Sequence, residues 1–355
     1  MCFLKLFCVN FVTHKENTSS YFTINDMMEN LISAFPANIT EALAIAKASI
    51  IKPAKQEITN IVICGMGGSG IGGRIVEKWI EDEINIPVNG VSAYSLPNYV
   101  NENTLVIGSS YSGNTEETLS CIEEAISKNA QIIGITSGGK LKDICSSNGF
   151  DCIIVPGGNP PRTALAFSLV QLLNILSAHE LISKDSLSNL ESARNLVVSN
   201  ETEIKSIAHN LAEFLKGRVG ILYGETKFEP MLVRARQQFN ENGKLLCWHH
   251  VIPEMNHNEL VGWGGGDNRF AVVYFTSDDM HARNVKRMEI GMDVIKKKGA
   301  SQMEIKAIGN SFIEQTIYLI NIVDWASLYL SDLKNVDPID IEVIDFLKSE
   351  LANFT

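Results

Sequence analysis

The sequence predicts an α/β protein built from two doubly wound parallel-sheet domains with flanking helices. Its 355 residues exceed one ordinary core, and 45% hydrophobic with 20% charged residues is the composition of a globular protein. In two separate stretches, short apolar runs alternate with segments of helical spacing, the pattern of parallel strands joined by right-handed helical crossovers. A long helical stretch without strand signals lies between these two stretches and separates the domains.

The first domain is expected to span residues 27–180. Apolar residues follow helical spacing from Asn30 to Lys55, and helical stretches recur at 116–128 and 141–148. Between them lie runs that are apolar throughout, which is typical of strands covered on both faces. These runs are 61–64, 104–108, 131–136 and 152–155.

The second domain is expected to span residues 205–355, after a helix-rich stretch at 163–215 that contains a linker near 180–210. Strand runs return in this part of the chain, followed by two closing helices. The strands are predicted at 218–223, 269–275 and 302–307, and the helices at 312–330 and 337–353. The two halves share no evident residue-level repeat, so only their architecture is duplicated.

Composition restricts the class of partner and the compartment. The net charge of −11 argues against nucleic acid, whose phosphate backbone needs a basic face, but not against a metabolite with one phosphate. The seven cysteines form no CxxC pair, so we expect neither a disulfide framework nor a cysteine zinc site, and a reducing cytoplasm fits.

The N-terminal segment requires separate treatment. Its apolar start, residues 1–12, is broken by Lys5 and Asn10 and falls short of the roughly 20 residues that span a bilayer. It also lacks the basic leader and cleavage site of a signal peptide. We therefore expect no membrane contact, and we expect residues 1–26 to be absent or disordered, with translation starting at Met27 or Met28.

A glycine-rich loop follows the first strand. Gly65, Gly67 and Gly70 have the GxGxxG spacing that lets backbone N–H groups approach a phosphate at a helix N-terminus. A dinucleotide site would need an acidic residue at the end of the next strand, and 87–94 contains none. A dinucleotide loop, a glycine turn used only for packing and another kind of phosphate loop all remain open on this motif alone.

A hydroxyl-rich loop, Ser109-Ser-Tyr-Ser-Gly-Asn-Thr115, follows the second strong strand and precedes a helix. Ser110, Ser112 and Thr115 surround a glycine, and with the N–H groups of the helix start they form an anion cradle without metal or lysine. The alternative is ordinary capping of the helix by Thr115. Capping requires one hydroxyl rather than three, so the pattern favours a phosphate cradle.

The S-x-S-G-N-T motif resembles the hallmark of the sugar isomerase (SIS) domain. Gly68 and Ser69 stand where the first loop of that fold meets the sugar. Two such domains, over about residues 28–352, resemble the bifunctional phosphoglucose/phosphomannose isomerases. The resemblance implies that Gly68, Ser69, Ser110, Ser112 and Thr115 bind the phosphosugar.

Arg162 is the first candidate for the chemistry. It ends the sequence Gly157-Gly-Asn-Pro-Pro-Arg162 after the last strand of the first domain, where two prolines would fix an arginine near anionic or hydroxyl groups. A surface arginine after a turn is the alternative. The resemblance implies an active-site arginine over the reacting carbons.

Glu241 is the candidate base. It ends an amphipathic helix that starts at Glu229, with Gly243 as the expected cap, so the negative end of the helix dipole favours its proton uptake. On position alone, a solvated glutamate is the more common case. The N-E-N-x-K sequence around it matches the catalytic base of the resembled family.

The cluster His249-His-Val-Ile-Pro-Glu-Met-Asn-His-Asn-Glu259 allows two interpretations. Its histidines and glutamates could suggest a metal site, but the spacing fits no helical H-x-x-x-H pair and Pro253 interrupts it. The P-E-x-x-H-N-E match implies that His257 helps to open the sugar ring, with Glu254 and Glu259 orienting it. The family's histidine enters the neighbouring subunit's site, which implies a homodimer. We expect no metal and no cofactor.

Lys348 is the third member of the expected acid–base set. In the last predicted helix it falls on one stripe with Ile341 and Ile344, close to Leu347, which we expect to be core residues. This is an unusual place for a lysine unless it snorkels or serves a site. The resemblance implies a catalytic lysine in this L-K pair. Lys334 is the reserve candidate, although a lysine at a helix C-terminus is also explained by the helix dipole.

The implied activity is the interconversion of glucose 6-phosphate and mannose 6-phosphate with fructose 6-phosphate through a cis-enediol. Two alternatives are an isomerase or deglycase like that of glucosamine-6-phosphate synthase, and a non-enzymatic phosphosugar-binding regulator. The former lacks the paired N-E-N-G-K and P-E-M-N-H-N-E motifs present here, and the latter usually carries a basic DNA-binding domain.

Overall fold

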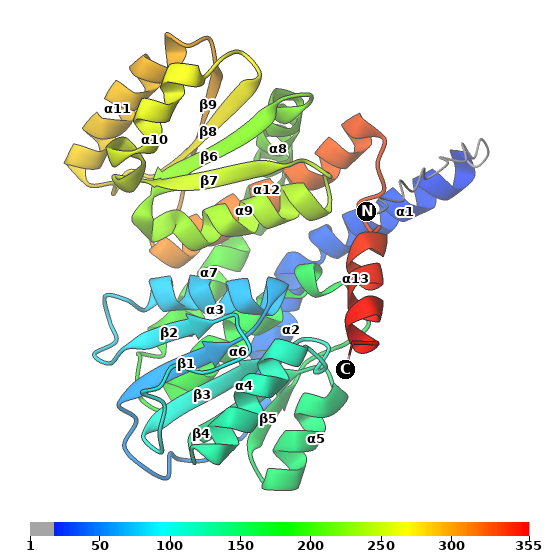
Figure 1. Ribbon diagram of the computed structural model, residues 1–355, viewed down its shortest axis with the longest axis vertical. Helices are drawn as coiled ribbons and strands as arrows, with labels where there is room; N and C mark the ends of the chain where they lie inside the picture. The colour runs from blue at the N-terminus through cyan, green and yellow to red at the C-terminus, as the bar shows by residue number, and fades with distance from the viewer. Residues whose placement is uncertain (1–17, 355) are drawn as a thin grey trace, which may run out of the picture.

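The computed structural model describes residues 18–354, and the chain forms two α/β lobes joined by helices (Figure 1). One lobe contains a five-stranded sheet and the other a four-stranded sheet, and every strand pair in both sheets is parallel. The predicted fold class is therefore confirmed. Residues 1–17 of the expected N-terminal extension lie outside the described residues, and residues 18–26 belong to the first helix, α1 (Thr18–Ser33).

The sheet of the first lobe has the order β2-β1-β3-β4-β5. Its strands are β1 (Asn60–Cys64), β2 (Val88–Val91), β3 (Thr104–Ser109), β4 (Gln131–Thr136) and β5 (Asp151–Ile154). The chain moves outward in both directions from β1 and β3, so the carboxyl ends of these two strands form a topological switch point, where α/β sheets bind ligands. Cys64 of β1 lies beside Gly108 of β3 there.

Alternate residues of these strands enter two different cores. Ile61 and Ile63 of β1 face α2 (Phe35–Ala48), α3 (Gly67–Trp79) and α6 (Leu165–Ala178). Val62 and Cys64 face α4 (Glu116–Ser127) and α5 (Gly139–Asn148). Burial on both faces explains why the strand sequences are apolar throughout.

The sheet of the second lobe has the order β7-β6-β8-β9. Its strands are β6 (Val219–Glu225), β7 (Cys247–Ile252), β8 (Phe270–Thr276) and β9 (Ser301–Lys306). One face packs on α9 (Glu229–Glu241) and α12 (Phe312–Lys334), and the other on α10 (Glu259–Gly262) and α11 (Ala282–Lys296). Along the chain, most strands of both lobes are thus followed by a helix that covers the sheet.

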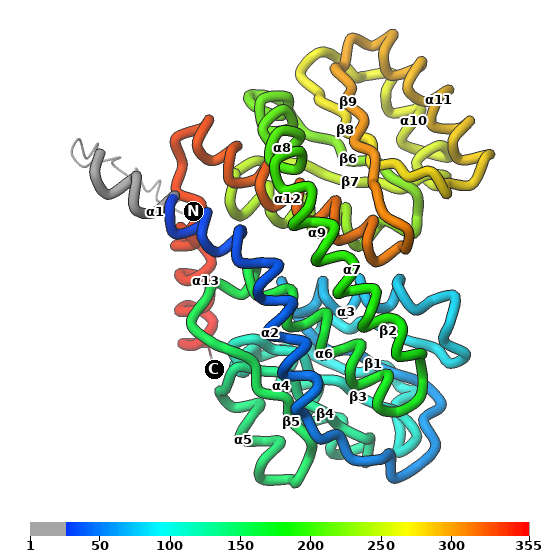
Figure 2. Tube along the Cα trace, turned by 180° about the vertical axis from the view of Figure 1, so that it is seen from behind, coloured from blue at the N-terminus to red at the C-terminus, as the bar shows by residue number. Residues whose placement is uncertain are grey.

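One apolar core continues through both lobes. It includes Ile107 of β3 and Val273 of β8, and it passes through α6, α12 and the helices α7 (Asp185–Ser199) and α8 (Glu201–Leu215). Figure 2, the view from behind, shows α2 and α7 on the near side of the first lobe, with α7 leading into α8 of the second lobe. Helix α12 is buried on nearly all sides, as its apolar sequence requires.

The structure differs from the sequence-based expectation at three places. The predicted helical stretch 30–55 is divided between two helices: α1 ends at Ser33, Ala34 forms a turn, and α2 ends at Ala48. The residues that follow α2, up to 59, are irregular. Strand β7 was not predicted, since it is an edge strand that carries two histidines. The last helix, α13 (Glu342–Ala352), starts five residues later than the Asp337 that was expected to begin it.

Candidate functional site

Three loops meet at the carboxyl ends of β1, β3 and β5. They are the glycine loop (residues 65–70), the hydroxyl loop (109–115) and the arginine loop (157–162). The backbone N–H of Tyr111 donates to Ser69 Oγ at 3.2 Å, which joins the first two loops. A Cβ on Gly68 would lie 2.9 Å from the carbonyl oxygen of Pro161, so only glycine allows the first and third loops this close approach.

The hydroxyl loop forms a closed network of short hydrogen bonds. The hydroxyls of Ser110 and Thr115 lie 2.8 Å apart, and the N–H of Gly113 donates to Ser110 Oγ at 3.1 Å. Gly113 has φ +70°, and a Cβ there would collide with the carbonyl of Gly138. Ser112 is exposed at the rim of the loop, and its Oγ accepts from the N–H of Asn114 at 3.2 Å.

The capping alternative for Thr115 is resolved by these contacts. Thr115 occupies the N-cap position of α4, but its side chain makes no capping hydrogen bond to the helix and contacts Ser110 instead. The first N–H groups of α4 therefore remain available to an anion placed over the loop. The loop geometry fits the predicted phosphate cradle.

Arg162 and Glu241, 79 residues apart in the sequence, form an ion pair between the two lobes. Arg162 Nη1 lies 2.7 Å from Glu241 Oε1, and the Arg162 side chain is only 4% exposed against 29% for Glu241. Burial lowers the pKa of Arg162 from its ordinary value, and the Glu241 carboxylate opposes that change. A guanidinium keeps its charge under this shift, so the alternative of a surface arginine is wrong.

Two lysines hold the turn after α9 beside this site, and one of them, Lys244, also contacts the segment between α12 and α13. Lys244 Nζ donates to the backbone carbonyls of Glu241 (2.6 Å) and Asp340 (2.7 Å), and burial lowers the pKa of Lys244. Lys334 Nζ donates to the carbonyls of Gly243 and Lys244 at 2.8 and 2.7 Å. Lys334 therefore caps the turn after α9. The helix-dipole explanation given by the sequence involves only its own helix, α12.

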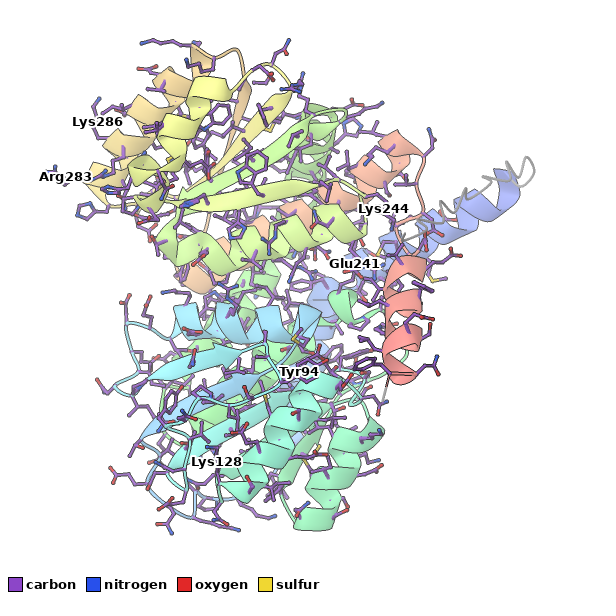
Figure 3. All side chains as sticks on the ribbon, in the orientation of Figure 1. Tyr94, Lys128, Glu241, Lys244, Arg283 and Lys286 are labelled. Carbon is purple, nitrogen blue, oxygen red and sulfur yellow. The ribbon has the colours of Figure 1, made fainter. Side chains whose placement is uncertain are left out.

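His257 lies far from Glu241 within one chain. Glu241 precedes the start of β7, whereas His257 ends the short helical turn Glu254–His257 that follows the end of this strand. Six residues of extended strand span roughly 20 Å. His257 is exposed, and Figure 3 shows Glu241 at the opposite end of α9 from the segment that follows β7.

The two glutamates expected to orient His257 bond to other residues. Glu259 Oε1 accepts from Tyr223 OH at 2.5 Å and from Trp248 Nε1 at 3.1 Å. Glu254 Oε1 accepts from Asn258 Nδ2 at 3.0 Å. These bonds brace the turn around His257 rather than the imidazole itself.

Lys348 lies on a helix that the other residues described by the structure leave uncovered. No residue of α13 is buried, and the Lys348 side chain is 68% exposed and lies 3.7 Å from Asp345. The stripe that the sequence assigned to the core is exposed as well, with Ile344 at 42% and Leu347 at 57%. The expectation that α13 packs on its own core is therefore wrong, because the helix stands beside the lobes (Figure 1).

The histidine cluster does not assemble into a metal site in the part of the chain that the structure describes, where no three candidate ligands converge. His249 faces α9, and burial together with Arg236 and Arg74 lowers its pKa to about 4. Its Nε2 lies 3.9 Å from Glu229. None of the described helices has the length and apolarity needed to cross a bilayer.

The structure adds three residues to those singled out in the sequence. Asn242 Oδ1 accepts from Arg162 Nε at 2.7 Å, and the Pro338 carbonyl accepts from Arg162 Nη2 at 2.7 Å. Tyr111 OH accepts from the N–H of Asn159 at 3.3 Å and so links the hydroxyl and arginine loops. Asn242 stands within the N-E-N-G-K motif and could have been noted there, whereas no local signal marks Pro338.

Comparisons with known proteins agree with this arrangement. Residues 55–167 match the SIS domain, and residues 204–351 match the bacterial phospho-glucose isomerase C-terminal SIS domain. The bifunctional phosphoglucose/phosphomannose isomerase of Caldicellulosiruptor bescii is 38% identical over 327 residues, which cover 89% of this chain and 96% of that protein. The protein of the same name from Aquifex aeolicus is 35% identical, over 82% of this chain and 90% of its own length.

Solved structures share the fold at much lower sequence identity. The C-terminal domain of glucosamine-fructose-6-phosphate aminotransferase from Francisella tularensis superposes with a TM-score of 0.69 at 15% identity. The match covers 87% of this chain and 96% of that domain. At this identity the similarity shows the two-domain architecture alone.

Proposed function

The chain belongs to the family of bifunctional phosphoglucose/phosphomannose isomerases, and we propose that it interconverts glucose 6-phosphate and mannose 6-phosphate with fructose 6-phosphate. The observation that carries this proposal is the pair formed by Arg162 and Glu241 at 2.7 Å, which joins the lobes beside the three loops. A carboxylate next to a fixed guanidinium, within reach of an anion cradle, suits proton transfer on a phosphorylated sugar.

The proposed reaction is an aldose–ketose isomerisation. Glu241 takes the proton from C2 of the open aldose and returns it to C1, while the proton of the C2 hydroxyl is lost and the C1 oxygen is protonated. Arg162 stabilises the negative charge that develops on the oxygens of the cis-enediol. One enediol serves both aldoses if the base delivers a proton to either face of C2.

The phosphate is assigned to the glycine and hydroxyl loops. Gly68 and Ser69 would contact it from the start of α3, and Ser110, Ser112 and Thr115 from the start of α4. Two helix N-termini with their free N–H groups favour an anion between them. Anchoring the phosphate orients the chain of the sugar so that one carboxylate reaches both C1 and C2.

The site is proposed to be shared between two copies of the chain. His257 would open the sugar ring in the partner's site, together with Lys348. Two observations support sharing. His257 follows β7, which separates it from Glu241 by roughly 20 Å of strand. The apolar side chains of α13 are not buried by any of the described residues. A homodimer that buries α13 would bring both groups toward Glu241.

We also propose a cytoplasmic location and a role in carbohydrate metabolism, in glycolysis and gluconeogenesis. Cysteines 64, 121, 145, 152 and 247, all within the described residues, are free, which suits a reducing compartment.

A coupled assay with each hexose 6-phosphate, with and without EDTA, tests the function. We expect turnover of both glucose 6-phosphate and mannose 6-phosphate, unchanged by the chelator. Loss of activity with EDTA would restore the metal interpretation of the histidine cluster. Turnover only with glutamine or a fructosamine phosphate would favour the synthase-like or deglycase alternative, and binding without turnover would favour a regulator.

A further inference from the structure

Arg162 is held at both ends by groups that do not belong to the proposed reaction. Its Nε donates to Asn242 Oδ1 at 2.7 Å and its Nη2 donates to the Pro338 carbonyl at 2.7 Å. Its own backbone carbonyl accepts from Arg234 Nη2 at 2.8 Å. Only Nη1 is directed at the carboxylate of Glu241.

The single hydrogen bond between Arg162 and Glu241 differs from the usual geometry of an arginine–carboxylate pair. A planar guanidinium usually pairs with a carboxylate through two parallel hydrogen bonds. Here the side-on edge of the guanidinium, formed by Nε and Nη2, is already engaged by Asn242 and Pro338. Glu241 therefore receives one bond, from Nη1 to Oε1, and its Oε2 is left for another partner. A base that carries a proton needs such a free oxygen.

Asn242 is itself fixed, and the direction of each hydrogen bond is determined. Arg162 Nε can only donate, so the amide oxygen of Asn242 must face it, and the amide Nδ2 then donates to Ser327 Oγ at 2.9 Å. The Ser327 hydroxyl donates in turn to the backbone carbonyl of Asp324 at 2.7 Å. Asn242 is fully buried, so bulk water does not compete for these bonds.

Asp324 of α12 anchors two chains of hydrogen bonds that end on Arg162, one through Arg234 and one through Ser327 and Asn242. Its carboxylate pairs with Arg234 Nη2 at 3.0 Å from each oxygen and accepts from Gln238 Nε2 at 2.9 Å. Burial raises the pKa of Asp324, and the contacts with Arg234 and Gln238 lower it. One residue of α12 thus supports the Arg162 carbonyl through Arg234 and the guanidinium through Ser327 and Asn242.

We propose that Asn242 is a positioning residue that prevents Arg162 from pairing side-on with Glu241 and so keeps one carboxylate oxygen of the base free. This inference rests on the proposed isomerase function. Without the Asn242 oxygen, Nε has no acceptor, and the guanidinium turns its Nε–Nη2 edge toward Glu241 and pairs with it through two bonds. The phosphate loops are untouched, so substrate binding is retained.

The test compares three variants by steady-state kinetics. Asn242→Leu, which keeps the shape and removes the acceptor, lowers kcat about 30- to 100-fold with KM within about threefold. Asn242→Asp keeps an acceptor for Nε, so its kcat is at least about three- to fivefold higher than that of Asn242→Leu. The matched control Asn240→Ala, a neighbour on α9 that donates to the Leu245 carbonyl, stays within about twofold of the parent.

A second measurement separates positioning from general destabilisation. If Asn242 acts through Arg162, adding Asn242→Leu to Arg162→Lys lowers kcat no further, because lysine has no planar fork to orient. Additive losses in the double variant, or a Leu variant with the kcat of the parent, would overturn the proposal. Urea unfolding of each variant reports stability independently of these rates.

A spectroscopic readout makes the proposal independent of activity. With ¹⁵N-labelled arginine, the Nε–H signal of Arg162, identified by its loss in Arg162→Lys, moves or broadens in Asn242→Leu and not in Asn240→Ala. An unchanged Arg162 signal in Asn242→Leu refutes the positioning role. If the parent enzyme turns over no hexose phosphate while the signal responds as stated, the isomerase function fails and the Asn242–Arg162 contact stands.

Discussion

At the scale of single residues, the site depends on two side chains from different lobes that contact each other at 2.7 Å. Arg162 follows the last strand of the first sheet, and Glu241 ends a helix of the second lobe. Each has a local reason for its place: the prolines before Arg162 restrict the backbone, and the end of α9 sets the position of Glu241. Their chemistry depends on the contact between them.

Glu241→Gln is expected to lower kcat by about 10³-fold and leave substrate binding nearly unchanged, because the amide accepts the hydrogen bond of Arg162 but cannot take a proton. Kinetics and a binding measurement with fructose 6-phosphate check this. Glu213→Gln on α8 serves as the control. Activity within tenfold of the parent would remove Glu241 from the role of base.

Ser112→Ala is expected to raise KM about five- to tenfold, with kcat within about threefold, because the hydrogen bond from one hydroxyl to the anionic phosphate is lost. Ser112 is suited to this test because it is exposed at the rim, whereas Ser110 is buried in the loop network. Ser127→Ala, at the far end of α4, is the matched control. An unchanged KM would contradict the assignment of the phosphate to this loop.

At the scale of secondary-structure elements, β7 and α13 stand out because they lie at the edge of the fold yet carry a half-buried histidine and exposed apolar side chains, respectively. Strand β7 lies at the edge of its sheet and bears His249, whose side chain packs toward α9. Helix α13 presents Val343, Phe346 and Leu347 to solvent, with Val343 81% and Phe346 65% exposed. A helix of 11 residues is barely stable in water without a surface to pack on.

The stability of the protein is expected to fall as the pH drops from about 6.5 to about 4, in part because of His249. Burial, Arg236, Arg74 and His250 lower its pKa to about 4 in the fold, against the raising effect of Glu259, so below pH 6.5 the unfolded chain binds a proton that the fold does not. His249→Gln should reduce this pH-dependent loss by up to about 2 kcal/mol. Urea unfolding at pH 7 and pH 4.5 measures it, and parallel curves for parent and variant would contradict the assignment.

Phe346→Ser is expected to weaken a homodimer about tenfold or more, because a large apolar side chain loses its buried surface in the interface. Sedimentation velocity over a range of protein concentrations measures the dissociation constant. Glu350→Gln on the same helix is the control. Equal dimer affinities for the parent and Phe346→Ser would mean that α13 is covered by something other than a second copy.

At the scale of the whole molecule, one continuous core links the two lobes, so their relative position is set by packing rather than by a flexible linker. Helix α12 is central to this packing, since α8 and α9 pack on it and Asn242, which holds Arg162, bonds to its Ser327. A rigid junction suits a site in which a loop of one lobe must meet a helix end of the other within hydrogen-bond distance.

Mixing two inactive variants tests whether the site is shared between chains. If Glu241 and His257 of different copies form one site, refolding or exchanging equal amounts of Glu241→Gln and His257→Ala produces mixed dimers with one intact site each. Random pairing then restores about a quarter of the parent activity. If both residues act within one chain, every site in the mixture carries a lesion and no activity returns.

The degree to which the sequence anticipated the structure follows the range of the interactions. The buried strands were predicted because each is a continuous apolar run, and the hydroxyl loop because its residues are consecutive. Strand β7 was missed because an edge strand with polar residues lacks that pattern. The interpretation of α13 as a core-packed helix failed because its apolar stripe indicates burial and does not identify the surface that buries it.

The sequence by itself determined the α/β class, the two repeated sheet patterns, the glycine and hydroxyl loops and the motifs around Arg162, Glu241 and His257, because these depend on residues close together in the chain. Only the tertiary structure decided that Arg162 meets Glu241, that Asn242 and Pro338 hold the guanidinium, and that Lys348 is exposed on α13. Contacts between residues some 80 to 180 positions apart arise from the packing of whole elements, and no local pattern specifies them.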